Sequence, residues 1–160
     1  MNGEPARAAL GADPIVGRTL DVDGLRLAYD DEGQGPVVLC LHSIAHGARD
    51  FAPLRERLRG RCRVIALDWP GHGRSADDRM PAGASRYADV AERFADALGL
   101  RDVVLLGNSI GGAVAIRLAA RRPDLVRALV LADVGGLDRV DRTTRLVTRA
   151  MARFFAAGAR

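Results

Sequence analysis

A serine lies between two glycines at the point where a short apolar run gives way to a helical pattern. The stretch LLGNSIGGAVAIRLA contains Gly107, Ser109 and Gly111 in the pattern G-x-S-x-G. A sharp strand-to-helix turn would expose the serine hydroxyl, and the glycines leave the room that such a turn requires. The first N–H of the helix, from Ile110, could then stabilise an oxyanion. The pattern predicts that Ser109 is a nucleophile, and the alternative is a serine that only caps a helix.

A serine nucleophile needs a general base and an acid that orients the base. The sequence contains three histidines, His42, His46 and His72, and each follows a strand-like run. In open α/β sheets ligands bind at this end of the strands. His42 or His46 could therefore act as the base. A structural or solvated histidine is the more common role and is the one we expect for all three.

Short apolar runs alternate with helical patterns along the chain. The apolar runs lie at 36–42, 63–68, 102–107 and 128–133, and the helical patterns at 50–59, 85–99 and 110–121. Residues 19–30 alternate in polarity around Asp23-Gly24, which is typical of a hairpin. The order predicts an α/β fold with a mostly parallel sheet and an N-terminal antiparallel hairpin.

Together with the serine turn, three further segments resemble the α/β-hydrolase family. LCLHSIAHG is similar to its oxyanion loop, DWPGHGRS to its D-x-x-G-x-G-x-S turn, and RRPDLVRALVLAD to the passage into its sixth strand. The resemblance extends from about residue 18 to about residue 140. It implies that Ile44 provides the second oxyanion N–H beside Ile110. Ser43 stands where the family usually has glycine.

The resemblance also implies where the remaining catalytic groups lie. The family places its acid and then its histidine after the serine, with the base beyond the last strand. Asp133 matches a position that some relatives use for the acid, whereas most place the acid one strand later. The chain has no histidine after His72. We therefore expect an incomplete hydrolase that lacks its base and has little or no activity by itself.

The same resemblance predicts a fold truncated after the sixth strand, at the start of the family's cap. The expected divisions are a flexible N-terminus at 1–17, an incomplete core at 18–137 and a first cap helix at 138–160. The sixth strand would then be an apolar edge with unpaired backbone groups. Such edges pair with other chains, so we expect self-association.

Composition indicates a single soluble domain of 160 residues, 48% of them apolar. All 24 basic residues are arginines, and residues 138–160 carry six of them against two aspartates. A solvated helix face explains this charge, so we expect neither a nucleic-acid nor a membrane partner. No apolar run approaches a signal peptide or a membrane span. Cys40 and Cys62 show neither metal nor disulfide spacing, which predicts buried thiols and a cytoplasmic protein.

GHGRSA at 71–76 fits a dinucleotide loop only if a helix follows it, and DDRMPAG follows instead. We therefore expect a surface turn, no cofactor and no metal site.

The predicted function is hydrolysis of an ester or related acyl bond in a small-molecule substrate through an acyl-enzyme on Ser109. The serine turn GNSIGGA also resembles that of hydrolases that split carbon–carbon bonds in ring-cleavage products. A non-catalytic binding protein with this fold is the other alternative.

Overall fold

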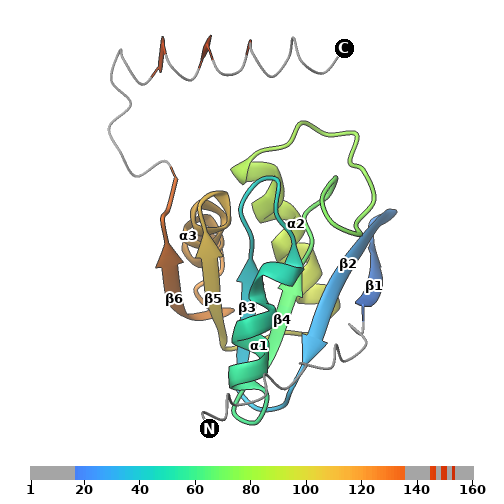
Figure 1. Cartoon of the computed structure of the whole chain (residues 1–160), viewed down its shortest axis with the longest axis vertical. Coiled ribbons are helices and arrows are strands. Elements are labelled where there is room, and N and C mark those ends of the chain that lie inside the picture. Colours follow the sequence, from blue (N-terminus) through green and yellow to red (C-terminus); the bar gives the residue numbers. More distant parts are fainter. Residues whose placement is uncertain (1–16, 136–144, 147–148, 151–152, 154–160) are drawn as a thin grey trace, which may run out of the picture.

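The computed structural model describes residues 17–135, 145–146, 149–150 and 153. Six strands form one sheet in the order β1-β2-β4-β3-β5-β6, shown in Figure 1. The bounds of the strands are β1 Gly17–Val22, β2 Leu25–Glu32, β3 Val37–Leu41, β4 Arg63–Leu67, β5 Val103–Asn108 and β6 Val126–Ala132. Strands β3 to β6 are parallel, whereas β2 runs antiparallel to β1 and β4. The predicted α/β architecture with an N-terminal antiparallel hairpin is confirmed.

A two-residue turn sets the register of the hairpin. Asp23 and Gly24 have φ values of 53° and 80°, which is the backbone of the turn that matches strand twist. The Asp21 carboxylate accepts a hydrogen bond of 2.8 Å from the Gly24 N–H. This turn pairs Val22 with Leu25 and Leu20 with Leu27.

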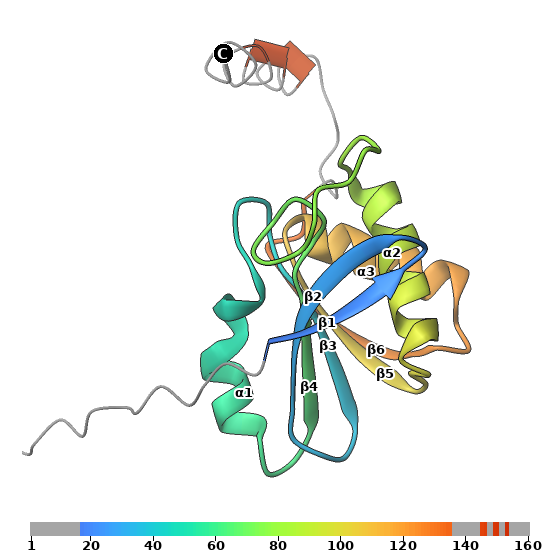
Figure 2. The ribbon, with the colours of Figure 1, turned by 90° about the vertical axis from the view of Figure 1, so that its right-hand side faces the viewer.

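Helices cover both faces of the sheet, as Figure 2 shows. The 3-10 helix η1 (Ala48–Phe51) and α1 (Ala52–Leu58) lie on one face, and α2 (Ala84–Ala97) and α3 (Ile110–Arg121) lie on the other. The expected helix at 50–59 is therefore divided. Pro53 lies in the first turn of α1, where a missing N–H costs no intrahelical hydrogen bond.

The central strands are buried on both faces, which explains their continuous apolar sequences. Leu39, Leu41, Ile65 and Leu67 belong to the larger core, which also contains the buried side chains of α2 and α3. The alternate residues of the same strands belong to a smaller core with η1, namely Val38, Cys40, Val64 and Ala66.

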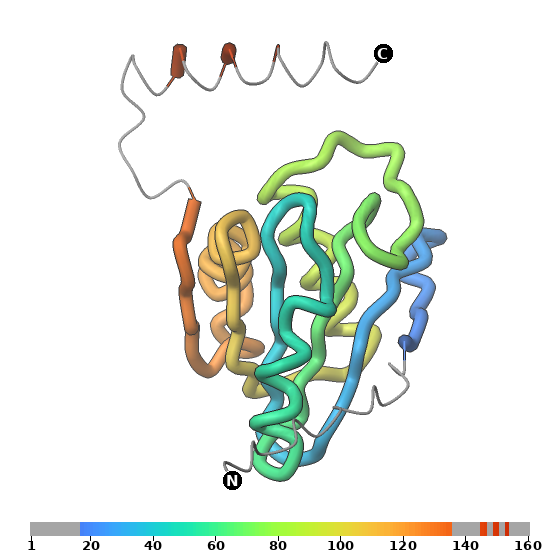
Figure 3. The backbone as a smooth tube through the Cα atoms, viewed as in Figure 1, coloured from blue at the N-terminus to red at the C-terminus, as the bar shows by residue number. Residues whose placement is uncertain are grey.

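The parallel strands end at the same edge of the sheet, so the segments that follow them gather there. Figure 3 shows the segments after β3 and β4 at this edge, beside the β5–α3 turn. These segments contain the residues that the sequence singled out for chemistry. The topology thus places a candidate site at the carboxyl edge of the sheet.

Several expectations concern other parts of the chain. The two cysteines are free, as expected, but Cys62 is only half-buried because it lies in the turn before β4. Most of the expected flexible N-terminus (1–16) and most of the expected cap helix lie outside the described residues. The described positions of that segment, 145–146, 149–150 and 153, are helical. Among the described residues, no helix is long and apolar enough to cross a membrane.

Alanine substitutions at two glycines with similar φ values distinguish the cost of backbone strain from the cost of a steric clash. Gly24 and Gly33 have φ values of +80° and +85°, yet a Cβ at Gly24 would meet nothing within 4 Å. A Cβ at Gly33 would lie 2.2 Å from the Cys62 carbonyl oxygen. We predict that Gly24→Ala lowers the free energy of unfolding by about 1–2 kcal/mol. Gly33→Ala should lower it by a further ~1–3 kcal/mol. Urea denaturation measures both, and equal losses would contradict the packing at Gly33.

Candidate active site

Ser109 is the single residue at which β5 turns into α3. Its backbone has φ 54° and ψ −115°, in the left-handed half of conformational space that side chains with a Cβ rarely occupy. Ser109 stands at the N-cap position of α3, but its hydroxyl makes no capping hydrogen bond, and its φ is unlike the extended one of most N-caps. Helix capping therefore does not explain the residue. Strain of this kind is typical of functional sites.

The glycines on either side of Ser109 lie too close to other backbone atoms for any side chain to fit. A Cβ at Gly107 would lie 2.5 Å from the Gly111 carbonyl oxygen, and a Cβ at Gly111 would lie 2.0 Å from the Leu41 carbonyl oxygen. The first turn of α3 thus packs directly on the end of β3. A third glycine, Gly112, packs against Val134, because a Cβ there would lie 2.6 Å from the Val134 side chain.

The segment that follows β6 holds the backbone of Ser109. The Ser109 N–H donates to the Ala132 carbonyl at 3.1 Å, and the Gly135 N–H donates to the Ser109 carbonyl at 3.3 Å. A Cβ at Gly135 would be 3.9 Å from Ser109 Oγ. Asp133 lies between these contacts, exposed and with φ 44°. The structure therefore places Asp133 in the segment beside Ser109, and its role as the acid stays a prediction.

His42 is fully buried and uses both of its ring nitrogens. The Trp69 N–H donates to His42 Nε2 at 3.0 Å, so Nε2 is an acceptor and Nδ1 carries the proton. His42 Nδ1 lies 2.6 Å from the Ser43 carbonyl and donates to it. Burial lowers the pKa of His42, which keeps the ring neutral. This ring holds the loop after β3 in place, as expected for a structural histidine.

The indole of Trp69 completes the connection between two loops. Its Nε1–H donates to the His42 carbonyl at 2.9 Å, and its ring stacks on Tyr87 of α2 with 4.8 Å between centroids. Trp69 is fully buried, so it is a packed aromatic residue. The loop after β3 and the turn after β4 are thereby joined to each other and to α2.

The other two histidines have local partners. His46 Nδ1 lies 2.6 Å from the Asp50 carboxylate, one helical turn further along the chain. His72 Nδ1 lies 3.1 Å from the Pro70 carbonyl oxygen. Neither ring is joined to Ser109 by a hydrogen bond in the described part of the chain. The described residues also contain no group of three or more His, Cys, Asp or Glu side chains able to hold a metal ion.

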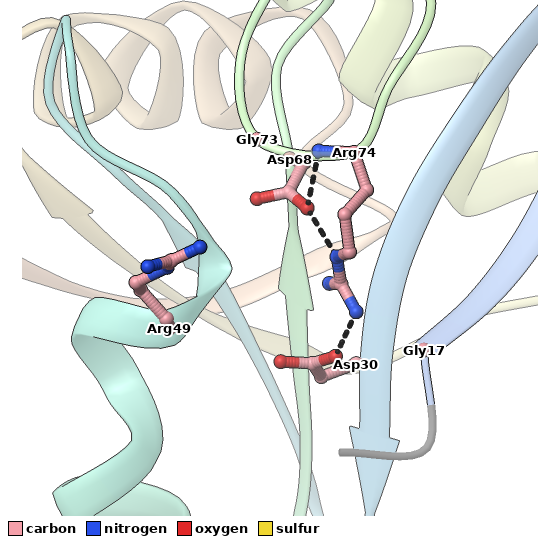
Figure 4. Close-up of a pocket in the computed structure, with 6 residues that line it drawn as sticks. All are labelled: Gly17, Asp30, Arg49, Asp68, Gly73 and Arg74. Carbon is pink, nitrogen blue, oxygen red and sulfur yellow. Dashed lines mark hydrogen bonds and ion pairs between the residues drawn. The ribbon is translucent and has the colours of Figure 1, made fainter.

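Asp68 fixes the turn that follows β4. Its buried carboxylate accepts the Ala48 N–H at 2.7 Å and Arg74 Nε at 2.9 Å, and a Cβ at Gly73 would lie 2.4 Å from it. Arg74 also reaches the buried Asp30 at 2.9 Å, as Figure 4 shows. Residues 71–76 form turns and bends, as expected, and the next helix begins only at Ala84.

These ion pairs border a cleft of about 280 Å³ beside β2 and β4. Gly17, Asp30, Arg49, Asp68, Gly73 and Arg74 line it. Ser109 is not among these residues, so this cleft is distinct from the serine turn. Its two buried carboxylates are both paired with arginines.

The two predicted oxyanion donors, Ile44 and Ile110, lie in separate segments of the chain. Ile110 is the first residue of α3, so its N–H has no partner within the helix. Ile44 is 47% exposed in the loop after β3, directly before Ala45 at φ 62°. Among the described residues, neither N–H takes part in a hydrogen bond. The contact of Gly111 with Leu41 brings the two segments together.

Comparison with known proteins decides the family. The family model of the alpha/beta hydrolase fold matches residues 36–158. The chain belongs to the α/β-hydrolase family. This membership confirms the resemblance that the four sequence segments indicated.

The relatives of this α/β hydrolase are longer proteins. It is 33% identical over 126 residues to 2-(acetamidomethylene)succinate hydrolase of Mesorhizobium japonicum, covering 79% of this chain and 45% of that protein. It is 36% identical over 132 residues to 2-hydroxymuconate semialdehyde hydrolase of Pseudomonas sp. strain CF600, covering 78% and 45%. A solved membrane phospholipase A has a TM-score of 0.77 at 30% identity, covering 84% and 45%. The chain thus spans less than half the length of each.

Two parts of the site were not anticipated from the sequence of this α/β hydrolase. The first is the pair of backbone hydrogen bonds that join Ser109 to Ala132 and Gly135. The Val134-Gly135 pair after the sixth strand was the sequence feature that could have indicated them. The second is the hydrogen bond from the Ala48 N–H to Asp68, 20 residues away. The turn sequence DWPGHGRS pointed to Asp68 but not to this partner.

The lowered pKa of buried His42 predicts how the free energy of unfolding depends on pH. Below about pH 6.5 an unfolded chain protonates this histidine, whereas burial lowers the folded pKa and keeps the ring neutral. The free energy of unfolding should therefore fall as pH decreases from 6.5, until the folded pKa is reached. In His42→Gln this slope should be smaller by up to about 1.4 kcal/mol per pH unit. Urea denaturation between pH 7 and pH 5 measures the slope.

The matched control is Thr19→Ser, which alters an exposed side chain that does not titrate in this range. Its slope should equal that of the unmodified chain. An unchanged slope in His42→Gln would show that His42 titrates as freely in the folded chain as in the unfolded one.

Proposed function

We propose that this chain carries the nucleophile and the oxyanion-binding groups of a serine hydrolase. Ser109 would attack the carbonyl carbon of an ester or related acyl bond and form an acyl-enzyme. The observation that carries the proposal is the backbone of Ser109, held at φ 54° with a hydroxyl that caps nothing. A residue that served only to begin a helix would not require this strain.

The first chemical step would place negative charge on the carbonyl oxygen. We assign its stabilisation to the N–H groups of Ile44 and Ile110, because both lack other partners among the described residues. Fixed backbone donors of this kind need no reorganisation during the reaction. Gly107 and Gly111 contribute by allowing the turn, and His42 contributes by holding the loop that carries Ile44.

The proton of the Ser109 hydroxyl needs an acceptor. His42 is unsuited to this role, because accepting a proton at Nε2 would break its hydrogen bond from Trp69. His46 and His72 each have another partner. We therefore propose that the base comes from outside the described residues. Asp133 is the one described carboxylate that we retain for the triad acid.

The names of relatives support the proposed substrate class. A phospholipase A is by name an ester hydrolase, and a solved example shares the fold of this chain at 30% identity. The proposal is accordingly a small-molecule substrate with an ester or related acyl bond. Acyl transfer through a serine requires no cofactor. The free Cys40 and Cys62 thiols support a reducing, cytoplasmic setting.

A second candidate reaction is hydrolysis of a carbon–carbon bond. It is favoured by the 36% identity to 2-hydroxymuconate semialdehyde hydrolase. The resemblance of the segment GNSIGGA to hydrolases of ring-cleavage products supports it too. The two reactions are distinguished by their substrates. Ser109-dependent turnover of 2-hydroxymuconate semialdehyde, with none of aryl or alkyl esters, would favour the second.

The test of the proposed function uses a fluorophosphonate probe and an activated aryl ester. We predict slow labelling of the chain at Ser109 and at most trace hydrolysis of p-nitrophenyl acetate. Oxyanion stabilisation alone can leave a residual acceleration of roughly 10³-fold over water. Ser109→Ala should abolish both signals. Peptide mapping by mass spectrometry identifies the labelled residue.

The matched control is Ser43→Ala, which removes a neighbouring hydroxyl and should leave the labelling at Ser109. His46→Ala and His72→Ala should also leave it unchanged. A folded chain that is not labelled at all would favour the binding-protein alternative. Rapid turnover that disappears with His46 or His72 would show that the base lies within the described residues.

A further inference from the structure

The cleft beside β2 and β4 contains an arginine that has no partner among the described residues. Arg49 belongs to η1, lines the cleft and is exposed. Its guanidinium makes neither a hydrogen bond nor an ion pair within the part of the chain that the structure describes. The next residue, Asp50, pairs with His46 instead. A guanidinium has five N–H donors in a planar fork, so Arg49 leaves all of them available to a ligand in the cleft.

A second arginine, Arg74, borders the same cleft from the turn after β4. Its Nε lies 2.9 Å from Asp68, and its Nη1 lies 2.9 Å from Asp30. Its Nη2 donates no hydrogen bond to any described residue. Figure 4 shows the Arg49 guanidinium turned toward the side of the cleft where Asp68 and Arg74 lie. N–H groups without acceptors thus come to this cleft from two different elements.

The two carboxylates of the cleft are already neutralised. Asp68 accepts hydrogen bonds from the Ala48 N–H at 2.7 Å and from Arg74 Nε at 2.9 Å. Asp30 lies 2.5 Å from the buried Arg55 guanidinium and 2.9 Å from that of Arg74. Together with the unpaired arginine of η1, three arginines face two carboxylates. One positive charge at the cleft therefore has no counter-ion among the described residues.

The volume of the cleft limits the size of a ligand. About 280 Å³ corresponds to roughly nine water molecules at ~30 Å³ each. Such a space accepts a small organic ion rather than a nucleotide or a polymer. The residues that line it come from η1, the start of β1, strand β2 and the segment after β4. Strands β3 and β5 lie between β4 and β6, so the outer strand β6 is not part of the cleft.

We propose that this cleft binds a small molecule with one carboxylate group, whose oxygens accept N–H groups from Arg49 and Arg74. The planar fork of a guanidinium matches the two oxygens of a carboxylate. A carboxylate also supplies the single negative charge that the cleft lacks. A phosphate dianion would place a further negative charge near Asp30 and Asp68, which is unfavourable. The site needs no contribution from Ser109, so it is independent of the proposed hydrolysis.

Propionate, propionamide and inorganic phosphate test the ligand class in NMR titrations of the whole chain at pH 7 and constant ionic strength. Propionamide has nearly the size and shape of propionate but no charge. We expect propionate to shift the Nε–H signals of Arg49 and Arg74 and the Gly73 amide, with saturation and a millimolar dissociation constant. Propionamide should shift none of these signals, because it lacks the charge that Arg49 requires. Phosphate should bind more weakly than propionate.

The variant Arg49→Gln tests the site without breaking a contact in the described structure. It should leave the melting temperature of the free chain unchanged. It should raise the dissociation constant of propionate about tenfold or more, because hydrogen bonds from a charged donor to a carboxylate are lost. The matched control is Arg57→Gln, which alters an exposed arginine of α1 that lies outside the cleft. Both quantities should stay the same in this control.

Four results would overturn the proposal. Propionate that causes no saturable shift would show that the cleft binds no carboxylate. Equal shifts with propionamide would show that the charge of Arg49 does not select the ligand. An unchanged dissociation constant in Arg49→Gln would place the carboxylate at another part of the chain. Tighter binding of phosphate than of propionate would contradict the assignment of the site to a carboxylate.

Discussion

The conformation of one residue, Ser109, constrains the rest of the carboxyl edge of the sheet. Its left-handed backbone lets β5 turn into α3 without an intervening loop. Such a conformation costs about 1–3 kcal/mol and persists only where surrounding contacts enforce it. Its N–H bonds to Ala132, and its carbonyl accepts the N–H groups of Gly112, Ala113 and Gly135. The end of β6 and the start of α3 together enforce the turn.

The turn also determines how closely the neighbouring strand can approach. Gly111 has no side chain, so the start of α3 can rest on the Leu41 carbonyl at the end of β3. The loop after β3 then lies beside the serine turn, and its shape is set by hydrogen bonds to buried groups. His42 and Asp68 provide these bonds through Trp69 and Ala48. Within the described residues, the N–H groups of Ile44 and Ile110 make no hydrogen bond, and the two segments that carry them are thus held together. The proposed oxyanion stabilisation requires such fixed donors, because they need no reorganisation during the reaction.

Local features of the site could be predicted from the sequence, and its long-range contacts could not. Asp23-Gly24 predicted the hairpin, and the apolar runs predicted the buried strands, because both signals depend on neighbouring residues. G-x-S-x-G predicted the strand-to-helix turn at Ser109. The tautomer of His42 depends on the Trp69 N–H, 27 residues away, and no sequence spacing reveals it. The buried pair of Arg55 in α1 with Asp30 in β2 depends in the same way on where α1 lies over the sheet.

The central claim is that Ser109 presents its hydroxyl to a carbonyl held by Ile44 and Ile110. A crystal structure of the chain after reaction with a fluorophosphonate tests it most directly. We expect phosphorus bonded to Ser109 Oγ, with one phosphonyl oxygen about 2.7–3.1 Å from the backbone nitrogens of Ile44 and Ile110. A phosphonyl oxygen that contacts neither nitrogen, or an adduct on another serine, would contradict the proposed role of these residues.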